Sequence, residues 1–161
     1  MKYAGVDIGK LGGICILQDD EVLFKTVMPV IKSTKTKPEY DIRQIVDVFM
    51  KYKPDITFIE KPILHPKSGK MAYHGSGFCF GLFQGILSAL NLSYDIIPPK
   101  IWQKNIFAGM SRKDTKQASI MFARRTQPII DWRATERSSK YHDGLTDSYC
   151  LSIYCMRQNS K

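Results

Sequence analysis

The fold of this chain is decided near its N-terminus, by the stretch KYAGVDIG at residues 2–9. The pattern is typical of a strand that ends in a tight glycine turn. A second strand is expected almost at once, at residues 12–17, and Asp19-Asp20 forms a turn into a third strand at residues 21–27. Because both connections are short, the three strands are expected to be antiparallel neighbours.

The rest of the chain predicts helices that cover this sheet and two further strands that extend it. The expected elements are a loop at 28–38, a helix at 39–52, a strand at 56–60, a polar loop at 61–72, a helix at 75–92, a strand at 93–97, one or two helical turns at 102–107, a helix at 114–125, irregular chain at 126–141 and a helix at 143–157. This order predicts an α/β protein of one domain, residues 1–161, with a mixed five-stranded sheet: three antiparallel strands, then two parallel ones.

The helix expected at residues 75–92 is apolar and unusually rich in glycine. Its glycines are Gly75, Gly77, Gly81 and Gly85. Glycine lowers helix propensity but lets a helix approach a sheet or a second helix closely. The phenylalanines of this helix are expected in the core or in a dimer interface rather than as platforms for bases; they are Phe78, Phe80 and Phe83.

Composition and charge narrow the class of protein. The 161 residues are 43% hydrophobic, which excludes a disordered chain, and 24 Lys plus Arg against 15 Asp plus Glu give a net charge of +9. Residues 101–161 hold 11 of the basic residues and only 5 of the acidic ones. Such a basic half favours a polyanionic partner such as nucleic acid, although a lysine-rich solvated surface would give the same count.

The cysteines and the hydropathy pattern indicate a reducing compartment. Cys15, Cys79, Cys150 and Cys155 are scattered among apolar neighbours and form no C-x-x-C pair, so we expect four buried thiols. No apolar run reaches the roughly 18 residues of a membrane span, and no signal peptide precedes the first strand. The expected location is intracellular, in the cytoplasm or nucleoid if the protein is bacterial or from a phage, without contact with a membrane.

Four acidic residues stand where carboxylates are costly. Asp7 and Glu60 each follow an apolar strand, and Asp143 and Asp147 lie four residues apart on one face of the last helix. Carboxylate oxygens that converge without Cys favour Mg²⁺ or Mn²⁺ over zinc. Structural roles are open for three of them: Asp7 as a turn cap, Glu60 as a partner of Lys61, and Asp143 as a first-turn helix acid.

Five motifs in order resemble the RuvC-type Holliday junction resolvases, most closely in style the small phage and viral members. They are Val6-Asp7-Ile8-Gly9, Ile59-Glu60-Lys61-Pro62, Pro98-Pro99-Lys100, Arg112-Lys113-Asp114-Thr115-Lys116 and His142-Asp143-Gly144-Leu145-Thr146-Asp147. The resemblance covers nearly the whole chain and implies an RNase H-like fold. It also implies a metal-dependent endonuclease that acts as a homodimer and nicks two symmetric strands of a DNA four-way junction.

The resemblance assigns roles residue by residue. Asp7, Glu60, Asp143 and Asp147 match the acidic positions that hold two Mg²⁺ ions per subunit, for which Mn²⁺ is expected to substitute. Lys104 and Lys116 match basic positions near the cleaved phosphate. The last two acids are spaced by four residues rather than the usual three, so His142 is a rival to Asp143 as the fourth ligand. After Glu60, Ile63 and its neighbours replace the aromatic wedge of many members.

Basic side chains outside this acidic set are expected to bind DNA phosphates without reading bases. They are Lys61, Lys67, Lys70, Lys100, Arg112, Lys113, Arg124 and Arg125. Three other functions fit parts of the sequence. A nuclease of the same fold could act on another branched DNA or on RNA–DNA hybrid, a non-catalytic module could bind nucleic acid, and a sugar-kinase-like phosphotransferase could use the glycine turn after Asp7, although 161 residues are short for its two domains.

Overall fold

The computed structural model describes residues 1–31, 38–63, 69–110 and 114–160. Its main sheet contains β1 (Lys2–Asp7), β2 (Gly13–Gln18), β3 (Glu21–Val27), β6 (Ile56–Glu60) and β7 (Tyr94–Ile97), in the order β3-β2-β1-β6-β7. β1, β2 and β3 are antiparallel neighbours, and β6 and β7 continue the sheet parallel to β1. The predicted sheet, three antiparallel strands followed by two parallel ones, is confirmed.

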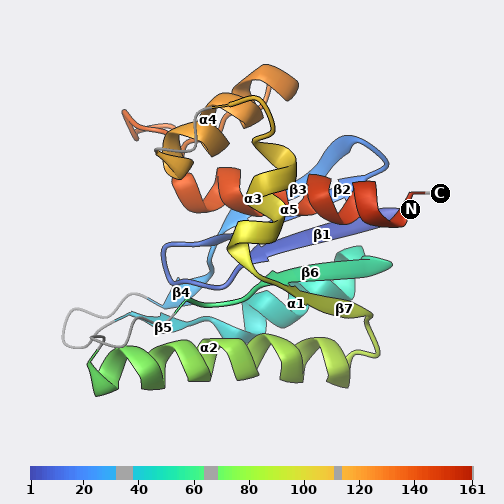
Figure 1. The fold of residues 1–161 in the computed structure, drawn as a ribbon. Helices are drawn as coiled ribbons and strands as arrows, with labels where there is room; N and C mark the ends of the chain where they lie inside the picture. Colours follow the sequence, from blue (N-terminus) through green and yellow to red (C-terminus); the bar gives the residue numbers. More distant parts are fainter. Residues whose placement is uncertain (32–37, 64–68, 111–113, 161) are drawn as a thin grey trace.

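Helices cover both faces of this sheet (Figure 1). One face carries α1 (Ile42–Tyr52) and α2 (Lys70–Ala89), and the other carries α3 (Pro99–Ile106), α4 (Thr115–Thr126) and α5 (Asp143–Asn159). Because side chains alternate across a strand, β1 contributes Ala4 and Val6 to the first core and Tyr3 to the second. The sheet therefore separates two apolar cores, and β1 lies between them.

α5 packs on β1 more closely than ordinary side chains would allow. A Cβ atom added to Gly5 would lie 2.2 Å from the carbonyl oxygen of Ser148 and 2.4 Å from the backbone nitrogen of Ser152. At the start of α5, a Cβ on Gly144 would lie 2.3 Å from the carbonyl oxygen of Leu11. Glycine at these positions sets the distance between the helix and the strand, and with it the height of the first turns of α5 above the end of β1.

Several predicted boundaries are wrong. The long helix begins at Lys70 rather than Gly75 and ends at Ala89, so Lys70 belongs to its first turn and not to a polar loop. Residues predicted as a loop and a helix start form the short strands β4 (Val30–Ile31) and β5 (Glu39–Tyr40). α3 is a full eight-residue helix that begins at Pro99, three residues before the predicted helical turns; proline is tolerated in the first turn because its missing N–H would have no partner within the helix.

The predicted role of the α2 glycines against the sheet is also wrong. A Cβ atom added to any of the four would meet nothing within 4 Å, since the glycines lie on the outer side of the helix. Of the three phenylalanines, Phe83 is buried in the core, Phe80 is half-buried and Phe78 is exposed. The helix is held to the sheet by large apolar side chains rather than by close backbone approach.

All four cysteines are free and buried, as predicted. Burial raises the pKa of the Cys15 thiol and of the Cys155 thiol to about 12. Such thiols behave as small apolar side chains. None of the helices in the described part of the chain is long and apolar enough to span a membrane.

Candidate active site

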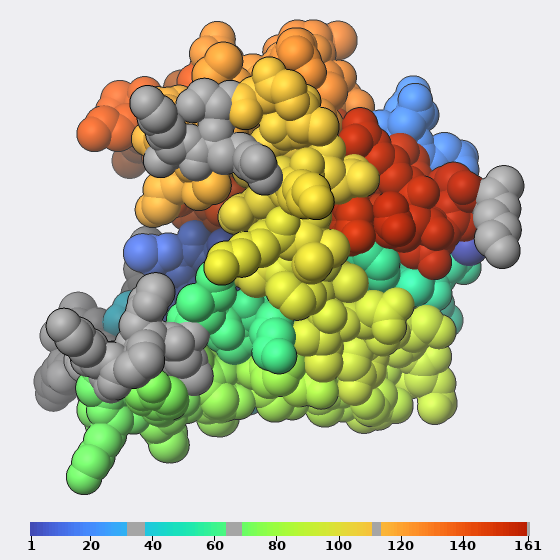
Figure 2. Space-filling model, viewed as in Figure 1, coloured from blue at the N-terminus to red at the C-terminus, as the bar shows by residue number. Residues whose placement is uncertain are grey.

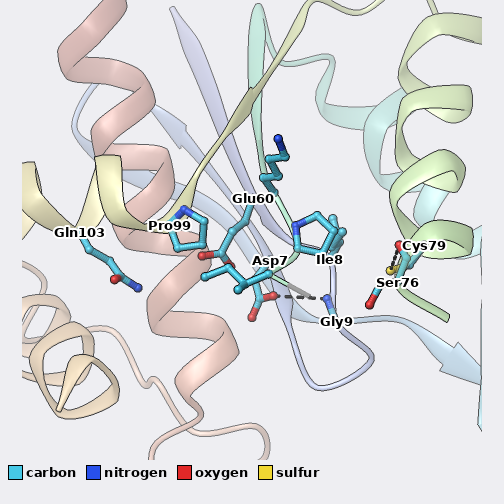
Figure 3. Close-up of a pocket in the computed structure, with 11 residues that line it drawn as sticks. Asp7, Ile8, Gly9, Glu60, Ser76, Cys79, Pro99 and Gln103 are labelled. Atoms are coloured by element: carbon cyan, nitrogen blue, oxygen red, sulfur yellow. Dashed lines mark hydrogen bonds between the residues drawn. The ribbon is translucent and has the colours of Figure 1, made fainter. Parts of the chain in front are cut away.

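The carboxylates of Asp7 and Glu60 lie side by side at one end of the sheet. Asp7 is the last residue of β1, and Glu60 is the last residue of the adjacent parallel strand β6. The register pairs Val6 of β1 with Ile59 of β6, so the next residues, Asp7 and Glu60, lie at neighbouring strand ends. Figure 3 shows both side chains in the same cavity. Parallel pairing thus brings together residues that are more than fifty positions apart in the sequence.

The turn after β1 fixes the backbone around Asp7. The Gly9 N–H donates to Asp7 Oδ1 at 3.3 Å, and the Gly12 N–H donates to the Gly9 carbonyl at 2.8 Å. Tyr40 of β5 donates its hydroxyl hydrogen to the Ile8 carbonyl at 2.9 Å. Asp7 therefore does cap a turn, as the structural alternative required, but one N–H bond leaves most of its acceptor capacity unused.

α5 brings the other two acids to this end of the sheet. Asp143 is the first residue of α5 and Asp147 follows one turn later. Both carboxylates act electrostatically on Asp7 or Glu60: the charge of Asp143 raises the pKa of Asp7, and the charge of Asp147 raises the pKa of Glu60. The structure therefore brings the four predicted acids into one electrostatic cluster.

Burial makes this cluster hard to ionise. It raises the pKa of Asp7 to about 6, that of Glu60 to about 8 and that of Asp147 to about 7, in each case with a further rise from neighbouring carboxylates. Hydrogen bonds from Gly9, Trp102 and Ser119, respectively, lower these pKa values by less. Three carboxylates whose charged forms are opposed by their surroundings are typical of a site that needs a cation.

Lys116 is the one basic side chain paired with the cluster in the described chain. Its Nζ lies 2.6 Å from Asp143 Oδ2, and 73% of its side chain is exposed. Burial alone would raise the pKa of Asp143, but the hydrogen bond and charge of Lys116 outweigh it and hold that pKa below its usual value. Lys116 stands in the first turn of α4, so the ion pair joins the start of α4 to the start of α5.

His142 is committed to the helix that follows it. It is the N-cap of α5, and its Nδ1 accepts a hydrogen bond from the Leu145 N–H at 3.2 Å. Burial lowers the pKa of its imidazole. Only Nε2 of His142 is then free to bind a cation. Both oxygens of Asp143 already have partners: Oδ1 accepts from the Gly144 N–H, and Oδ2 pairs with Lys116 of α4.

A cavity of about 340 Å³ opens beside Asp7 and Glu60. α2 contributes Ser76 and Cys79 on one side and α3 contributes Gln103 on the other, as Figure 3 shows. Lys61, Pro62 and Ile63 continue the wall beyond Glu60. In the space-filling view α3 covers the centre of this face of the molecule, between α2 and α4 (Figure 2).

The remaining predicted basic residues that the structure describes lie on the surface. Lys61, Lys70, Lys100, Lys104, Arg124 and Arg125 are exposed. Lys104 is in the last turn of α3, and no contact among the described residues joins it to the acids. Arg124 lies 4.9 Å from the ring centroid of Tyr141. Lys67, Arg112 and Lys113 fall outside the described residues.

Two features of the site have no counterpart in the sequence prediction. Trp102 donates its indole N–H to Glu60 Oε1 at 3.1 Å, and the hydroxyl of Ser119 of α4 lowers the pKa of Asp147. A tryptophan next to Pro98-Pro99 could have been flagged, because a buried indole N–H needs a partner. Ser119 gave no such signal, since it resembles any small residue on the inner face of an amphipathic helix.

The donor chemistry fits a hard divalent cation, although the side chains are not gathered around one point. The cluster supplies only carboxylate oxygens, which Mg²⁺ and Mn²⁺ prefer, and three of its carboxyls have raised pKa values, so a cation beside them would favour their charged forms. Among the described residues, no three His, Cys, Asp or Glu side chains stand close enough together to hold one ion. The residues therefore fit the ion in type and charge, and ligation requires side-chain adjustment.

Solved structures share this fold across nearly the whole chain. RuvC of T. thermophilus in complex with Holliday junction substrate matches with a TM-score of 0.67 at 13% identity, covering 99% of this chain and 98% of that one. The Fowlpox virus resolvase in complex with Holliday junction DNA matches with a TM-score of 0.52 at 17% identity, covering 100% of both chains. The yeast mitochondrial Holliday junction resolvase gives 0.55 at 14% identity, over 96% of this chain and 77% of that one.

These matches show the RNase H-like fold of the RuvC-type resolvases, as the motifs predicted. No protein-family model matches the sequence, and no curated protein matches it. At 13–17% identity the likeness is one of fold.

Proposed function

We propose that this protein is a structure-specific DNA endonuclease that resolves four-way junctions by paired, symmetric, metal-dependent nicks. One observation carries the proposal: four half-buried carboxylates, from the ends of β1 and β6 and the first turns of α5, act on one another's ionisation on a fold shared with junction-bound resolvases. A module that only bound DNA would gain nothing from four acids at one place, because carboxylates repel phosphate wherever they ionise.

Each acid has a separate place in the proposed site. Asp7 and Glu60, from adjacent strand ends, would hold the two Mg²⁺ ions together with Asp143 and Asp147 from α5, and Nε2 of His142 is the alternative to Asp143. When bound, two such ions activate a water, neutralise the phosphate and stabilise the leaving oxygen of a phosphodiester. Mn²⁺ offers the same preference for oxygen ligands and is expected to substitute.

Lys116 supplies mobile positive charge at the edge of the cluster. It is exposed, and its ammonium group already lies on a carboxylate of the site. An entering phosphate would compete with Asp143 for this group, which would free the Asp143 carboxylate for a cation and leave Lys116 to stabilise charge on the phosphate. Lys104, on α3, is a second candidate for this role.

The surface around the site is suited to binding the DNA backbone. Lys61 lines the cavity, Lys100 is exposed in the first turn of α3, and Arg124 and Arg125 are exposed in the last turn of α4. Lys70 lies at the start of α2, while Lys67, Arg112 and Lys113 remain predictions from the sequence. Contacts of this kind position the enzyme on phosphates, so the shape of the junction rather than its sequence would select the substrate.

Paired incision requires two copies of the chain, and α2 offers a surface for them to meet. Its 20 residues include one charged side chain, Lys70, whereas the whole protein carries a net charge of +9. Met71, Tyr73 and Phe78 are exposed on it, Phe78 by 51%. Two strongly basic proteins could approach each other through this uncharged face without repulsion, and its outward glycines would allow close contact between two helices.

The proposal is tested with a synthetic four-way junction, a linear duplex of the same sequence and an RNA–DNA hybrid. Each is incubated with Mg²⁺ and, separately, with Ca²⁺. We expect symmetric nicks in the junction with Mg²⁺ and little cutting of the linear duplex. Cutting of the hybrid, or of another branched DNA in preference to the junction, would reassign the substrate to the alternative nuclease, and cutting of none would overturn the proposed activity.

A further inference from the structure

Trp102 of α3 is buried against α5 and has its one polar atom on the active site. Only 1% of the residue is exposed, and its ring meets the Phe107 ring edge-on with centroids 5.5 Å apart. It belongs to the apolar core that also contains Leu145 and Tyr149 of α5. The indole N–H points out of this core to Glu60 Oε1, at a distance of 3.1 Å.

This hydrogen bond restricts the Glu60 side chain from one side. A glutamate has three rotatable bonds, and Glu60 stands at the open end of β6, where the strand itself holds only its backbone. The indole of Trp102 cannot move with the Glu60 side chain, because the core encloses the ring. Oε1 is thereby tied to a rigid donor, and no hydrogen bond between described residues reaches Oε2.

We propose that Trp102 is a positioning residue that orients Glu60 for divalent cations by holding Oε1 and presenting Oε2. This inference rests on the proposed function, since it assigns Glu60 to the cation site. Groups that hydrogen-bond a metal-binding carboxylate fix its orientation, and their loss commonly costs 10- to 100-fold in metal affinity or activity. In this chain the fixed group is a buried ring that also packs on the helix carrying the other two acids.

The chain contains a matched control. Trp132 is equally buried, with no exposed surface, and its indole N–H donates to the Gln127 carbonyl at 3.4 Å, away from the acids. Trp102→Phe and Trp132→Phe each remove one buried indole N–H and keep an aromatic ring. Unfolding temperatures of both variants, measured without metal, separate general loss of packing from a specific effect at the site.

The experiment measures Mn²⁺ binding by calorimetry, without DNA, for the wild type and both variants. We expect Trp102→Phe to weaken Mn²⁺ binding by about 10- to 100-fold and Trp132→Phe to leave it within about twofold. In junction cleavage at limiting Mg²⁺, Trp102→Phe should lower kcat with little change in KM for DNA, and excess Mg²⁺ should restore much of the rate. A merely structural role would instead lower the unfolding temperature and leave the Mn²⁺ affinity of the folded protein unchanged.

The fluorescence of the one tryptophan left in each variant provides a second measurement. In Trp132→Phe the only indole is Trp102, so Mn²⁺ should change its fluorescence, whereas the fluorescence of Trp102→Phe should not respond. Equal Mn²⁺ affinity of wild type and Trp102→Phe would overturn the inference and leave the proposed function standing. A wild type that binds Mn²⁺, with the expected effect of Trp102→Phe, but cuts no DNA would overturn the proposed function alone. A wild type that binds no Mn²⁺ would overturn both.

Discussion

Glycines on the two faces of the sheet perform opposite tasks. On the α5 face, Gly5, Gly13 and Gly144 lie against backbone atoms that an added Cβ would approach to within 3.0 Å. On the α2 face, the glycines at 75, 77, 81 and 85 face open space. The first group fixes the position of α5, and hence of two acids, over the strand that carries a third. The second group leaves the outer side of α2 free for another molecule.

The face of the sheet that α5 covers is the rigid side of the molecule, because close backbone contacts fix that helix. The face that α2 covers is the available side, because the outer surface of α2 is open. The α5 face buries polar side chains such as Thr146, Ser148 and Ser152, each of which hydrogen-bonds within its own helix or to a neighbouring one. Buried polar groups of this kind demand defined partners and so define one arrangement. The α2 face is held by large apolar side chains and carries its exposed apolar residues outward.

The largest expected effect comes from the acid that ends β1. Asp7→Asn removes one ligand charge from the rigid side and should reduce junction cleavage by about 10³-fold or more, which corresponds to about 4 kcal/mol. Junction binding should be retained or improved, because a negative charge is lost. Asp47→Asn makes the same change on the exposed surface of α1 and should cleave normally. Loss of DNA binding by Asp7→Asn would instead give Asp7 a structural role.

The second effect compares the stability of variants from the two groups of glycines. Gly5→Ala would place a methyl group against two backbone atoms of α5 and should lower the free energy of unfolding by about 3 kcal/mol. Gly81→Ala adds a methyl group in open space within a helix and should raise it by up to about 1 kcal/mol. Urea denaturation of both variants measures this contrast. Similar changes in the free energy of unfolding for the two substitutions would contradict the distinction between glycines packed against backbone and glycines that face open space.

A third effect concerns pH and the metal-free protein. Asp7, Asp147 and Glu60 have pKa values of about 6, 7 and 8 in the folded chain, above those of ordinary carboxyls, so these three groups bind more protons in the folded state than in the unfolded state near neutral pH. The lowered pKa of His142 acts in the opposite direction, but it is one group against three. Stability should therefore fall as pH rises from 5.5 to 7.5, lowering the unfolding temperature in EDTA by about 5 °C.

Mg²⁺ should reverse most of that loss, because the cations replace the protons. The range ends at pH 7.5 because ionisation of cysteines in the unfolded chain would add a loss of the same sign at higher pH. The ion pair of Asp131 with Arg133 does not contribute, since the hydrogen bond from Arg133 lowers the pKa of Asp131 to about 2. An unfolding temperature that stays constant or rises with pH would contradict the buried cluster.

The smallest effect probes the available side. Phe78→Glu places a charge in the uncharged face of α2 and should weaken self-association by about tenfold or more, as seen in the mass from light scattering. The metal-free unfolding of dilute protein should change little, because Phe78 is half-exposed. A wild type with the mass of one 18.4 kDa chain at all concentrations would remove the case for paired incision.

The sequence predicted the sheet well because its strands are short, apolar and bounded by turns. It predicted the acids at β1 and β6 because a carboxylate directly after an apolar strand is conspicuous. It did not predict the start of α2, since Lys70, His74 and several glycines resemble a loop, and residues 70–75 are exposed, so no buried apolar stripe marks the first turns of this helix. Nor could it assign Trp102 to Glu60, because that contact joins residues 42 positions apart and depends on how α3 lies on the sheet.

Crystals of the protein soaked in Mn²⁺, with data collected at the manganese absorption edge, would show whether the four acids hold metal ions. We expect two anomalous peaks among the carboxylates of Asp7, Glu60, Asp143 and Asp147, and their loss in Asp7→Asn. Peaks elsewhere on the surface, or none near β1 and β6, would contradict it.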